Sequence, residues 1–467
     1  MKSEVNVFIY RRDYRIIDNL ALNKLVDKYP NTPILHIFIF NPIQIDKSKN
    51  AYYNKNCVEF MIQSLKSLRD TLKDSFYFFY DKDTNILQNL LKSFVINAIA
   101  WNIDYTPFAR ARDDELEKWC TSKNIDYITA QDYTLFEANF IKSGTNKPYE
   151  VFTPFYNKCI SLYDRISEPY TSPNISNLIY SAKKHNTKLP GLIKNIDQFY
   201  DNNPNPHLKV QGGRENALAI LEQVKRGTYK NYDITRNFPS VDKTTKLAAY
   251  IKFGCVSIRE VCQYFRKYCG LHHGLLRELI WREFYAHATW NNPHVLEGKP
   301  YKAALTNMRW LSRPEWYICV MEAKTGFPII DAAIKELKAT GWMNNRLRMV
   351  VASFIAKDLM MDWRIFERDL FARYLVDYDP STNCHSWQGM ASVGIDSAPY
   401  WRIMNPWIQM KKFDKDCVYI KKWLPELSHL TTSQIMGWRT QQPLHNYPEP
   451  MVDHEVQVKA YLAKWRK

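Results

Sequence analysis

The stretch Trp342–Pro406 decides the fold of this chain. It opens with WMNNRLRM at 342–349, continues through an apolar helical run to DWRIFERDLF at 362–371, and closes with DYDPSTNCHSWQGMASVGIDSAPYWRIMNP at 377–406. Polar side chains interrupt its apolar background, namely Asn344, Asn345, Arg346, Arg348, Asp377, Asp379 and Asn383. Each such group needs a partner when it is buried, and a core that only had to pack would not carry so many of them. The stretch therefore predicts a helical site that holds a large, flat, polar molecule.

The composition is that of a folded protein with a basic surface. The chain has 467 residues, of which 46% are hydrophobic and 24% charged, which allows two or three domains with substantial cores. The formal net charge is +16 and the pI is about 9.2. Nucleic acid is the first partner that such a surface predicts, and an anionic membrane face is the second.

The cysteines and the termini point to the inside of a cell. None of the nine cysteines belongs to a CxxC pair, so we expect no metal site and free thiols in a reducing compartment. The first apolar run ends at Arg11, too early for a signal peptide. No apolar run approaches the ~20 residues of a membrane span. We expect a soluble, intracellular protein (cytoplasm or nucleus).

Residues 1–135 alternate strand and helix patterns. The predicted strands are Val5–Tyr10, Ile34–Phe40, Phe76–Tyr80, Val95–Trp101 and Ile125–Thr129, with amphipathic segments such as 58–72 and 85–93 between them. This alternation predicts an α/β domain with a doubly wound parallel sheet.

The usual glycine-rich dinucleotide motif is absent after the first strand. YRRDYRIIDN stands in its place at residues 10–19. Two arginines and an aspartate at the carboxyl end of a strand have two interpretations. They bind an anion, or they attach this domain to another part of the chain.

The rest of the chain divides into a connector and a helical domain. Residues 136–205 are rich in Pro, Asn and Ser and predict a long ordered connector. Residues 206–467 predict an all-helical domain, because apolar residues recur there at i, i+3 and i+4 and no comparable strand pattern follows residue 212.

Several residues of the helical domain suggest chemistry. Thr244 and Thr245 stand at an apparent helix start, where hydroxyls suit a phosphate or simply a helix cap. Arg348 can pair with Asp377 and hold a loop against its helix. Asp379 and Asn383 would then offer a carboxylate and an amide to a flat heterocycle.

Nearly the whole chain resembles the photolyase/cryptochrome flavoprotein family, and most closely its class I cyclobutane pyrimidine dimer (CPD) photolyases. The similar segments are YRRDYRIIDNLAL, YEVFTPFY, ELIWREFY, TGFPIIDAAIKEL, GWMNNRLRMVVASFIAKDL, DSAPYWRIMNP and KKFDKDCVYIKKWLPEL, in the order that the family has them. The resemblance implies an α/β N-terminal domain and an all-α domain that binds FAD in a bent form. The matching FAD-contacting positions are Tyr232, Thr244, Thr245, Lys246, Leu247, Arg282, Asn345, Arg348, Asp377, Asp379 and Asn383.

The resemblance also assigns redox roles. Asn383 matches the residue that faces flavin N5, where an amide favours the reduced flavin used in repair. Trp387, Trp363 and Trp310 match the three tryptophans that pass an electron from the surface to the flavin. No metal is implied.

The lesion pocket of the family selects the substrate. Glu278 and Trp281 match contacts to the dimer, and Asn345 and Met349 match the dimer-repair pattern. Photolyases for the 6-4 photoproduct carry histidines at the last two positions, because their reaction needs proton transfer. Neither Asn345 nor Met349 is such a donor here, but His385 lies nearby in the sequence and could supply a proton.

Two departures from the family pattern stand near the pocket, and a basic set of side chains surrounds it. Gly389 replaces a second pocket tryptophan, and Ala248 replaces a serine of the phosphate segment. The predicted DNA contacts are Arg236, Glu278, Trp281, Asn345, Arg346, Met349, Trp387, Gly389, Arg402, Lys411 and Lys412.

These matches predict a monomeric, light-driven DNA repair lyase, in which FADH⁻ donates an electron to a flipped-out dimer and splits it. A second chromophore (folate, deazaflavin or flavin) is implied near WNIDYTPFARARD at 101–113. Three alternatives stay open: a cryptochrome photoreceptor, a 6-4 photolyase, and a DNA-binding flavoprotein without catalysis. The chain ends at Lys467 without the long polar tail of signalling members, which favours repair.

Overall fold

The structure, a computed structural model, describes residues 2–200, 203–305, 308–397, 399–438 and 446–465. Its contacts divide the chain into two compact units. The first comprises residues 1–204, 210–227 and 246–293, and the second comprises 205–209, 228–245 and 294–467. The division predicted from the sequence, at residues 135 and 205, stays a prediction.

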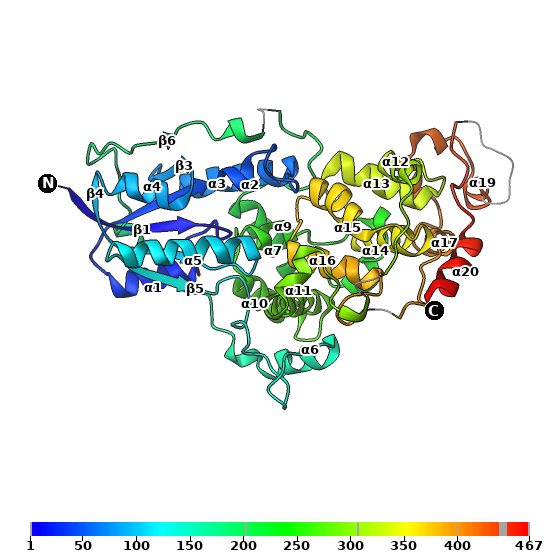
Figure 1. The fold of residues 1–467 in the computed structure, drawn as a ribbon, viewed down its shortest axis with the longest axis horizontal. Helices are drawn as coiled ribbons and strands as arrows, with labels where there is room; N and C mark the ends of the chain where they lie inside the picture. Colours follow the sequence, from blue (N-terminus) through cyan, green and yellow to red (C-terminus); the bar gives the residue numbers. More distant parts are fainter. Residues whose placement is uncertain (1, 201–202, 306–307, 398, 439–445, 466–467) are drawn as a thin grey trace. The chain divides into compact units, whose positions relative to one another are not determined.

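The first unit is built on a six-stranded sheet with the order β5-β4-β1-β2-β3-β6. Its strands are β1 (Ser3–Tyr10), β2 (Ile34–Phe40), β3 (Phe76–Tyr80), β4 (Phe94–Asn102), β5 (Asp126–Ala130) and β6 (Leu192–Ile193). The five predicted strands are confirmed and pair in parallel. The predicted doubly wound parallel sheet is therefore confirmed, and the short strand β6, which was not predicted, pairs antiparallel with β3 at one edge (Figure 1).

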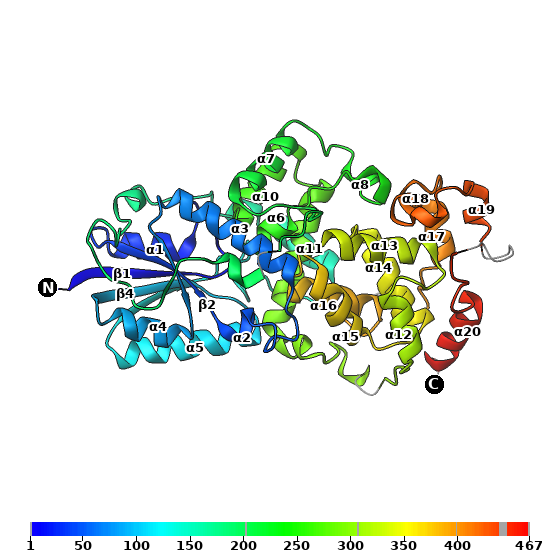
Figure 2. The same ribbon diagram turned by 90° about the horizontal axis from the view of Figure 1, so that it is seen from above.

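Helices cover both faces of this sheet, as a doubly wound fold requires. They are α1 (Leu20–Lys28), α2 (Pro42–Ile45), α3 (Lys55–Thr71), α4 (Asp83–Leu90) and α5 (Pro107–Ser122). Figure 2 shows α1 and α3 on one side of the sheet and α4 and α5 on the other. Buried Val5, Val7 and Ile9 of β1 pack in the core between the sheet and helices α4 and α5.

The segment predicted as a connector contains regular structure that the sequence analysis missed. α6 (Phe152–Ser161) forms there and packs against α11 (Gly274–Asn291). Short 3-10 turns and β6 follow it. The other helices of the unit are α7 (Arg214–Lys225), α9 (Ala248–Lys252) and α10 (Ile258–Cys269).

The RRD segment after β1 attaches the sheet to the helices of the same unit. Arg12 Nε donates to the carbonyl of Lys252 at 3.0 Å, and Arg15 Nη1 donates to that of Gly254 at 3.2 Å. The attachment interpretation of this segment is therefore supported.

A buried ion network completes the attachment. Arg15 pairs with Asp132 at 2.6 Å, and Arg259 pairs with Asp18 at 2.8 Å and with Asp132 at 2.6 Å. All four side chains are buried, so each charge depends on its partners.

The helix-cap interpretation of Thr244 and Thr245 is wrong. α9 begins only at Ala248, its N-cap residue is Leu247, and no side chain caps it. Lys246 has a φ of +56°, a left-handed conformation that is uncommon outside glycine. Backbone strain of this kind often accompanies a binding site.

In its described residues the second unit contains helices, loops and one isolated β-bridge between Leu311 and Met361, and no strand, as predicted. Its helices are α8 (Tyr232–Thr235), α12 (Pro314–Met321), α13 (Pro328–Thr340), α14 (Asn345–Ser353), α15 (Trp363–Phe366), α16 (Pro380–Met390), α17 (Pro406–Phe413), α18 (Val418–Trp423), α19 (Thr432–Met436) and α20 (His454–Trp465). Two π-helical turns, η7 (Phe354–Asp358) and η8 (Glu367–Ala372), follow α14 and α15. One continuous core joins α13, α14 and α16.

All nine cysteines lie in the described residues and are free thiols. Across the ranges that the structure describes, no helix combines the length and apolarity that a membrane crossing needs.

Candidate functional site

Arg348 and Asp377 form the ion pair that the sequence predicts. Arg348 Nη2 lies 2.9 Å from Asp377 Oδ2, and its Nε donates to the carbonyl of Met343 at 2.8 Å. The guanidinium thereby ties the first turn of α14 to the loop before α16. Asp377 Oδ1 is buried and has no hydrogen-bond partner among the described residues. Such a buried acceptor is suited to a polar ligand atom.

Asp379 starts α16. Its carboxylate accepts the backbone N–H of Thr382 at 3.0 Å, and Pro380 occupies the first helical position. A charged N-cap of this kind is favoured by the helix dipole. The cap fixes the direction in which Asn383 leaves the first turn of the helix.

A hydrogen-bonded chain that the sequence analysis missed orients Asn383. Its Nδ2 donates to Glu367 Oε1 at 2.7 Å, and the Tyr378 hydroxyl donates to the same oxygen at 3.0 Å. Because Glu367 Oε1 accepts both hydrogen bonds, it selects the amide nitrogen and leaves Asn383 Oδ1 as an acceptor on the other side. Among the described residues, no group donates a hydrogen bond to Asn383 Oδ1.

Glu367 lies at the first position of the π-helical turn η8 and is buried. Burial raises the pKa of its carboxyl to about 7, although the hydrogen bonds from Asn383 and Tyr378 oppose that rise. π-helical turns are frequent at functional sites. The only sequence signal for Glu367 was its place in the DWRIFERDLF motif.

The three predicted electron-transfer tryptophans belong to one core. Trp387 and Trp363 are buried, and Trp310 packs against the same cluster from its partly exposed position. The N–H of Leu311 donates to the carbonyl of Met360 at 2.8 Å, which brings the segment with Trp310 beside the start of α15. A relay through these indoles stays a prediction.

Three of the predicted basic residues gather in the second unit. Arg346 donates to Asn237 Oδ1 at 2.8 Å, and its guanidinium carbon lies 4.8 Å from the ring centroid of Phe413 on α17. Burial lowers the pKa of Arg346, and the neighbouring cations Arg236 and Arg402 lower it further. Guanidinium groups that lie close enough to repel one another are suited to a polyanion as their partner. Lys411 and Lys412 are exposed near the end of α17.

Lys357, which the sequence analysis also missed, supports the segment with Arg402. Its ammonium group is buried and donates to the Arg402 carbonyl at 2.9 Å. Burial lowers the pKa of Lys357 to about 8. The bond anchors a segment whose Trp401 and Arg402 side chains are exposed.

The two predicted lesion-pocket positions on α14 lie together. Asn345 is exposed, and its Nδ2 is 4.0 Å from Met349 Sδ one turn later. His385 is fully buried, and that burial lowers the pKa of its imidazole to about 3. It is therefore neutral at pH 7. A Cβ added at Gly389 would meet no atom within 4 Å. The position where the family pattern has a second pocket tryptophan is therefore open for a side chain.

Three further predicted residues lie on α11 in the first unit, and Tyr232 begins α8 in the second. Trp281 stacks on Phe152 of α6 with a centroid distance of 3.6 Å and an interplanar angle of 5°. Arg282 donates to the carbonyl of Tyr133 at 2.8 Å and lies 3.6 Å above its ring. Glu278 precedes Trp281 by one helical turn and is partly exposed.

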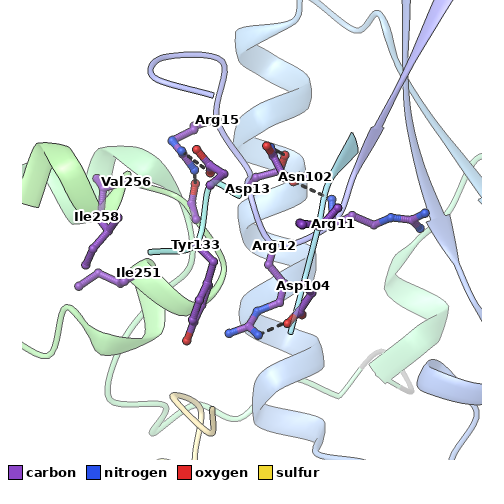
Figure 3. A pocket seen from close by; sticks show the side chains of 13 residues that line it. Arg11, Arg12, Asp13, Arg15, Asn102, Asp104, Tyr133, Ile251, Val256 and Ile258 are labelled. Atoms are coloured by element: carbon purple, nitrogen blue, oxygen red, sulfur yellow. Dashed lines mark hydrogen bonds and ion pairs between the residues drawn. The ribbon is translucent and has the colours of Figure 1, made fainter. Parts of the chain in front are cut away.

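The segment predicted to contact a second chromophore lines two small cavities at the carboxyl ends of the strands. Each has a volume of about 20 Å³, and both are lined by Ile103 and Tyr133. Figure 3 shows Arg12 at the first cavity, directed toward Asp104, with which it pairs at 3.2 Å, while Arg11 points away. Arg11 pairs instead with Asp83 at 2.5 Å.

The donor set of the second unit fits the polar edge of a flavin. It offers a cation, a carboxylate with a free buried oxygen, and an amide oxygen of fixed direction. No group of three or more His, Cys, Asp or Glu side chains in the described ranges could hold a metal ion. Together with a doubly wound sheet followed by a helical region, this set has the arrangement that the resemblance to photolyase-type flavoproteins implies.

The comparisons agree with that class. Residues 6–174 match the family model described as DNA photolyase, and residues 275–467 match the FAD binding domain of DNA photolyase. The deoxyribodipyrimidine photo-lyase of Synechococcus is 30% identical, over 99% of this chain and 96% of its own length. That of Escherichia coli is 31% identical, over 96% and 95%. The chain belongs to the DNA photolyase family.

Solved structures show the same relationship. An archaeal photolyase from Sulfolobus tokodaii, described with two FAD molecules, matches with a TM-score of 0.85 and 31% identity over 99% of both chains. A class III photolyase from Agrobacterium tumefaciens matches with a TM-score of 0.87 and 26% identity over 100% of this chain and 98% of its own. A Synechocystis cryptochrome at 24% identity, with a TM-score of 0.87 and 99% coverage of both chains, shares the fold.

Proposed function

We propose that this protein is a deoxyribodipyrimidine photo-lyase that repairs cyclobutane pyrimidine dimers in UV-damaged DNA with light. The observation that carries the choice of lesion is the pair Asn345 and Met349 on one exposed face of α14. Neither side chain can donate a proton as an acid at neutral pH. His385, the alternative donor, is buried and neutral, because the pKa of its imidazole is about 3. Proton transfer to a 6-4 photoproduct therefore has no evident source among these residues.

The protein's part in this function is to bind and to orient. When bound, reduced FAD supplies the light-excited electron that splits the dimer, which is chemistry of the cofactor. Arg348 and Asp377 would hold the cofactor-binding turn, and Asn383 would offer its amide oxygen to the flavin ring, as its match to the family implies. The segment 242–247, which holds the strained Lys246, binds the phosphates, as its match to the family implies. Trp310, Trp363 and Trp387 carry electrons to the flavin.

DNA is the proposed macromolecular partner. Arg236, Arg346 and Arg402 form a basic cluster, and phosphate contacts of this kind position a protein on a strand without reading its sequence. Glu278 and Trp281 contact the flipped-out lesion, whose weakened stacking makes extrusion cheaper than for a normal pair. We further propose that the protein acts as a monomer inside the cell.

A second chromophore in the first unit is also proposed. The segment 101–113 begins at the carboxyl end of β4, the end of the sheet at which ligands of doubly wound folds usually bind. The match to a photolyase with two FAD molecules supports a flavin as one candidate. A folate and a deazaflavin are the other two.

Repair of two defined lesions tests the main proposal. The protein is photoreduced without oxygen and illuminated with oligonucleotides that carry either a cyclobutane dimer or a 6-4 photoproduct. Restored restriction cutting of the first substrate alone is the expected result. Repair of the 6-4 product would contradict the pocket argument, and photoreduction without any repair would favour a photoreceptor.

Gly389→Trp is expected to tighten binding of the cyclobutane dimer about tenfold. The open space beyond Gly389 admits a side chain, and stacking of one base on an aromatic ring contributes about 1–3 kcal/mol. The affinities for damaged and intact duplexes are compared for the wild type and for Gly389→Ala, which adds no ring. Equal tightening for both duplexes would mean that the new ring does not reach the lesion.

A further inference from the structure

The guanidinium of Arg277 lies between two aromatic rings of α6. Its central carbon is 5.4 Å from the ring centroid of Phe152 and 5.4 Å from that of Tyr156, one helical turn further on. Arg277 itself is exposed on α11 and forms no ion pair with any described residue. Cation–π contacts hold a guanidinium in place but leave its charge uncompensated. The structure thus keeps an ordered, unneutralised cation at the surface of the first unit.

The same helix also positions Trp281. Phe152 stacks flat on its indole at 3.6 Å, and Phe284 and Tyr285 approach it at 5.9 and 5.5 Å. Arg277 and Trp281 are four residues apart on α11, so they share one face of the helix about 6 Å apart along its axis. A flat ring and a cation at this spacing match the base and the backbone phosphate of one nucleotide.

We propose that α6 and Arg277 extend the DNA-binding surface. Arg277 binds a backbone phosphate of the damaged strand next to the lesion, and Phe152 and Tyr156 preorganise it for that contact. Phe152 thereby supports both the phosphate contact and the ring that meets the dimer. The inference rests on the proposed function, since it places DNA at Trp281. It assigns a binding role to a helix within the segment that the sequence predicted as a mere connector.

Arg277→Gln tests the proposal, with Arg266→Gln as the matched control. Arg266 also lies on an aromatic ring, 4.2 Å from the centroid of Tyr163, but Asp164 pairs with it at 3.3 Å. Both variants remove one positive charge from the first unit. The dissociation constant is measured for a dimer-containing duplex across a salt series with the full-length protein loaded with FAD.

We expect Arg277→Gln to weaken binding about tenfold at physiological salt. The slope of the logarithm of the association constant against the logarithm of the salt concentration should become less steep by about 0.9, the value for one lost phosphate contact. Arg266→Gln should leave both quantities near those of the wild type. Equal effects of the two variants, or no effect of Arg277→Gln, would overturn the proposal.

Variants of Tyr156 separate the ring from the charge. Tyr156→Leu keeps the guanidinium but removes one of its two rings, so binding should weaken about threefold with the salt slope preserved. Tyr156→Phe keeps the ring and should bind like the wild type. Wild-type binding by Tyr156→Leu would overturn the preorganising role of the rings.

Failure of this inference is distinct from failure of the proposed function. A wild-type protein that repairs dimers, with Arg277→Gln unchanged in affinity and slope, overturns only the role of Arg277. A wild-type protein that repairs no lesion, with Arg277→Gln weakened as expected, overturns the repair function and supports the DNA contact.

Discussion

Arg348→Met is expected to lower the free energy of unfolding by about 3–5 kcal/mol and to release FAD. The cause is Asp377, whose side chain is 8% exposed and whose second oxygen has no partner among the described residues. Removing the guanidinium leaves this carboxylate buried and uncompensated. Urea unfolding gives the stability, and flavin absorbance after gel filtration gives the cofactor content.

Two variants serve as controls for this result. Arg364→Met breaks the more exposed pair with Asp362, where the Arg364 side chain is 51% exposed, and should cost less than about 1 kcal/mol. Arg348→Met combined with Asp377→Asn removes both charges and should recover a large part of the lost stability. A loss for Arg348→Met no larger than that for Arg364→Met would contradict the buried-pair argument.

The second large effect concerns Glu367 and depends on pH. Its pKa is about 7 in the folded protein and 4.5 as an ordinary glutamate, so the folded state keeps a proton that the unfolded chain loses between these values. The stabilising contribution of this group is thus complete below pH 4.5 and is lost as pH rises to 7. A shift of this size corresponds to about 3 kcal/mol. Glu367→Gln should therefore gain stability relative to the wild type as pH rises from 5 to 8.

Glu336→Gln provides the matched control. Glu336 is also buried, its pKa is also raised to about 7, and it accepts the Tyr419 hydroxyl at 2.7 Å, with no bond to Asn383. Both variants should show the same dependence of relative melting temperature on pH. If the difference in melting temperature between Glu367→Gln and the wild type does not change from pH 5 to pH 8, the raised pKa of Glu367 is contradicted.

Only Glu367 should affect the flavin. Glu367→Leu frees the Asn383 amide to rotate, so its oxygen would no longer be held toward the proposed position of flavin N5. A lost hydrogen bond of about 1 kcal/mol corresponds to reoxidation of the photoreduced flavin in air that is several-fold to tenfold faster. Glu336→Gln should reoxidise like the wild type. Equal rates for all three proteins would show that Asn383 does not need Glu367 to fix its direction.

β1 to β4 were predictable because each contains a compact apolar run of the length that a buried strand requires, whereas β5 (Asp126–Ala130) is mostly half-buried and was predicted from the alternation of strands and helices. β6 was not, since Leu192–Ile193 is a two-residue strand that only its pairing with β3 defines. α6 was detectable from the sequence, since its buried residues Phe152, Phe155 and Cys159 recur at helical spacing. The turn-forming residues around it hid this short pattern.

Much of the candidate site was predictable, and the Arg348–Asp377 pair was named from spacing and family match. Glu367 was missed because amphipathic patterns assume a regular helix, whereas the π-helical turn η8 changes which side chains face inward. Phe152 was missed for another reason. Its contact with Trp281 joins two helices far apart in the chain, and no local pattern reports such a contact.

The buried ion network of the first unit has a consequence for synthesis on the ribosome. Asp18 and Asp132 emerge early, but their partner Arg259 is made only 241 residues after Asp18. At translation rates of about 5–20 residues per second, the nascent sheet waits on the order of ten to fifty seconds for that charge. During this interval Asp132 can already pair with Arg15, whereas the Asp18 carboxylate lacks its Arg259 partner. The sheet is therefore translated first, but its buried ion network is completed only when α10 of the same unit has been made.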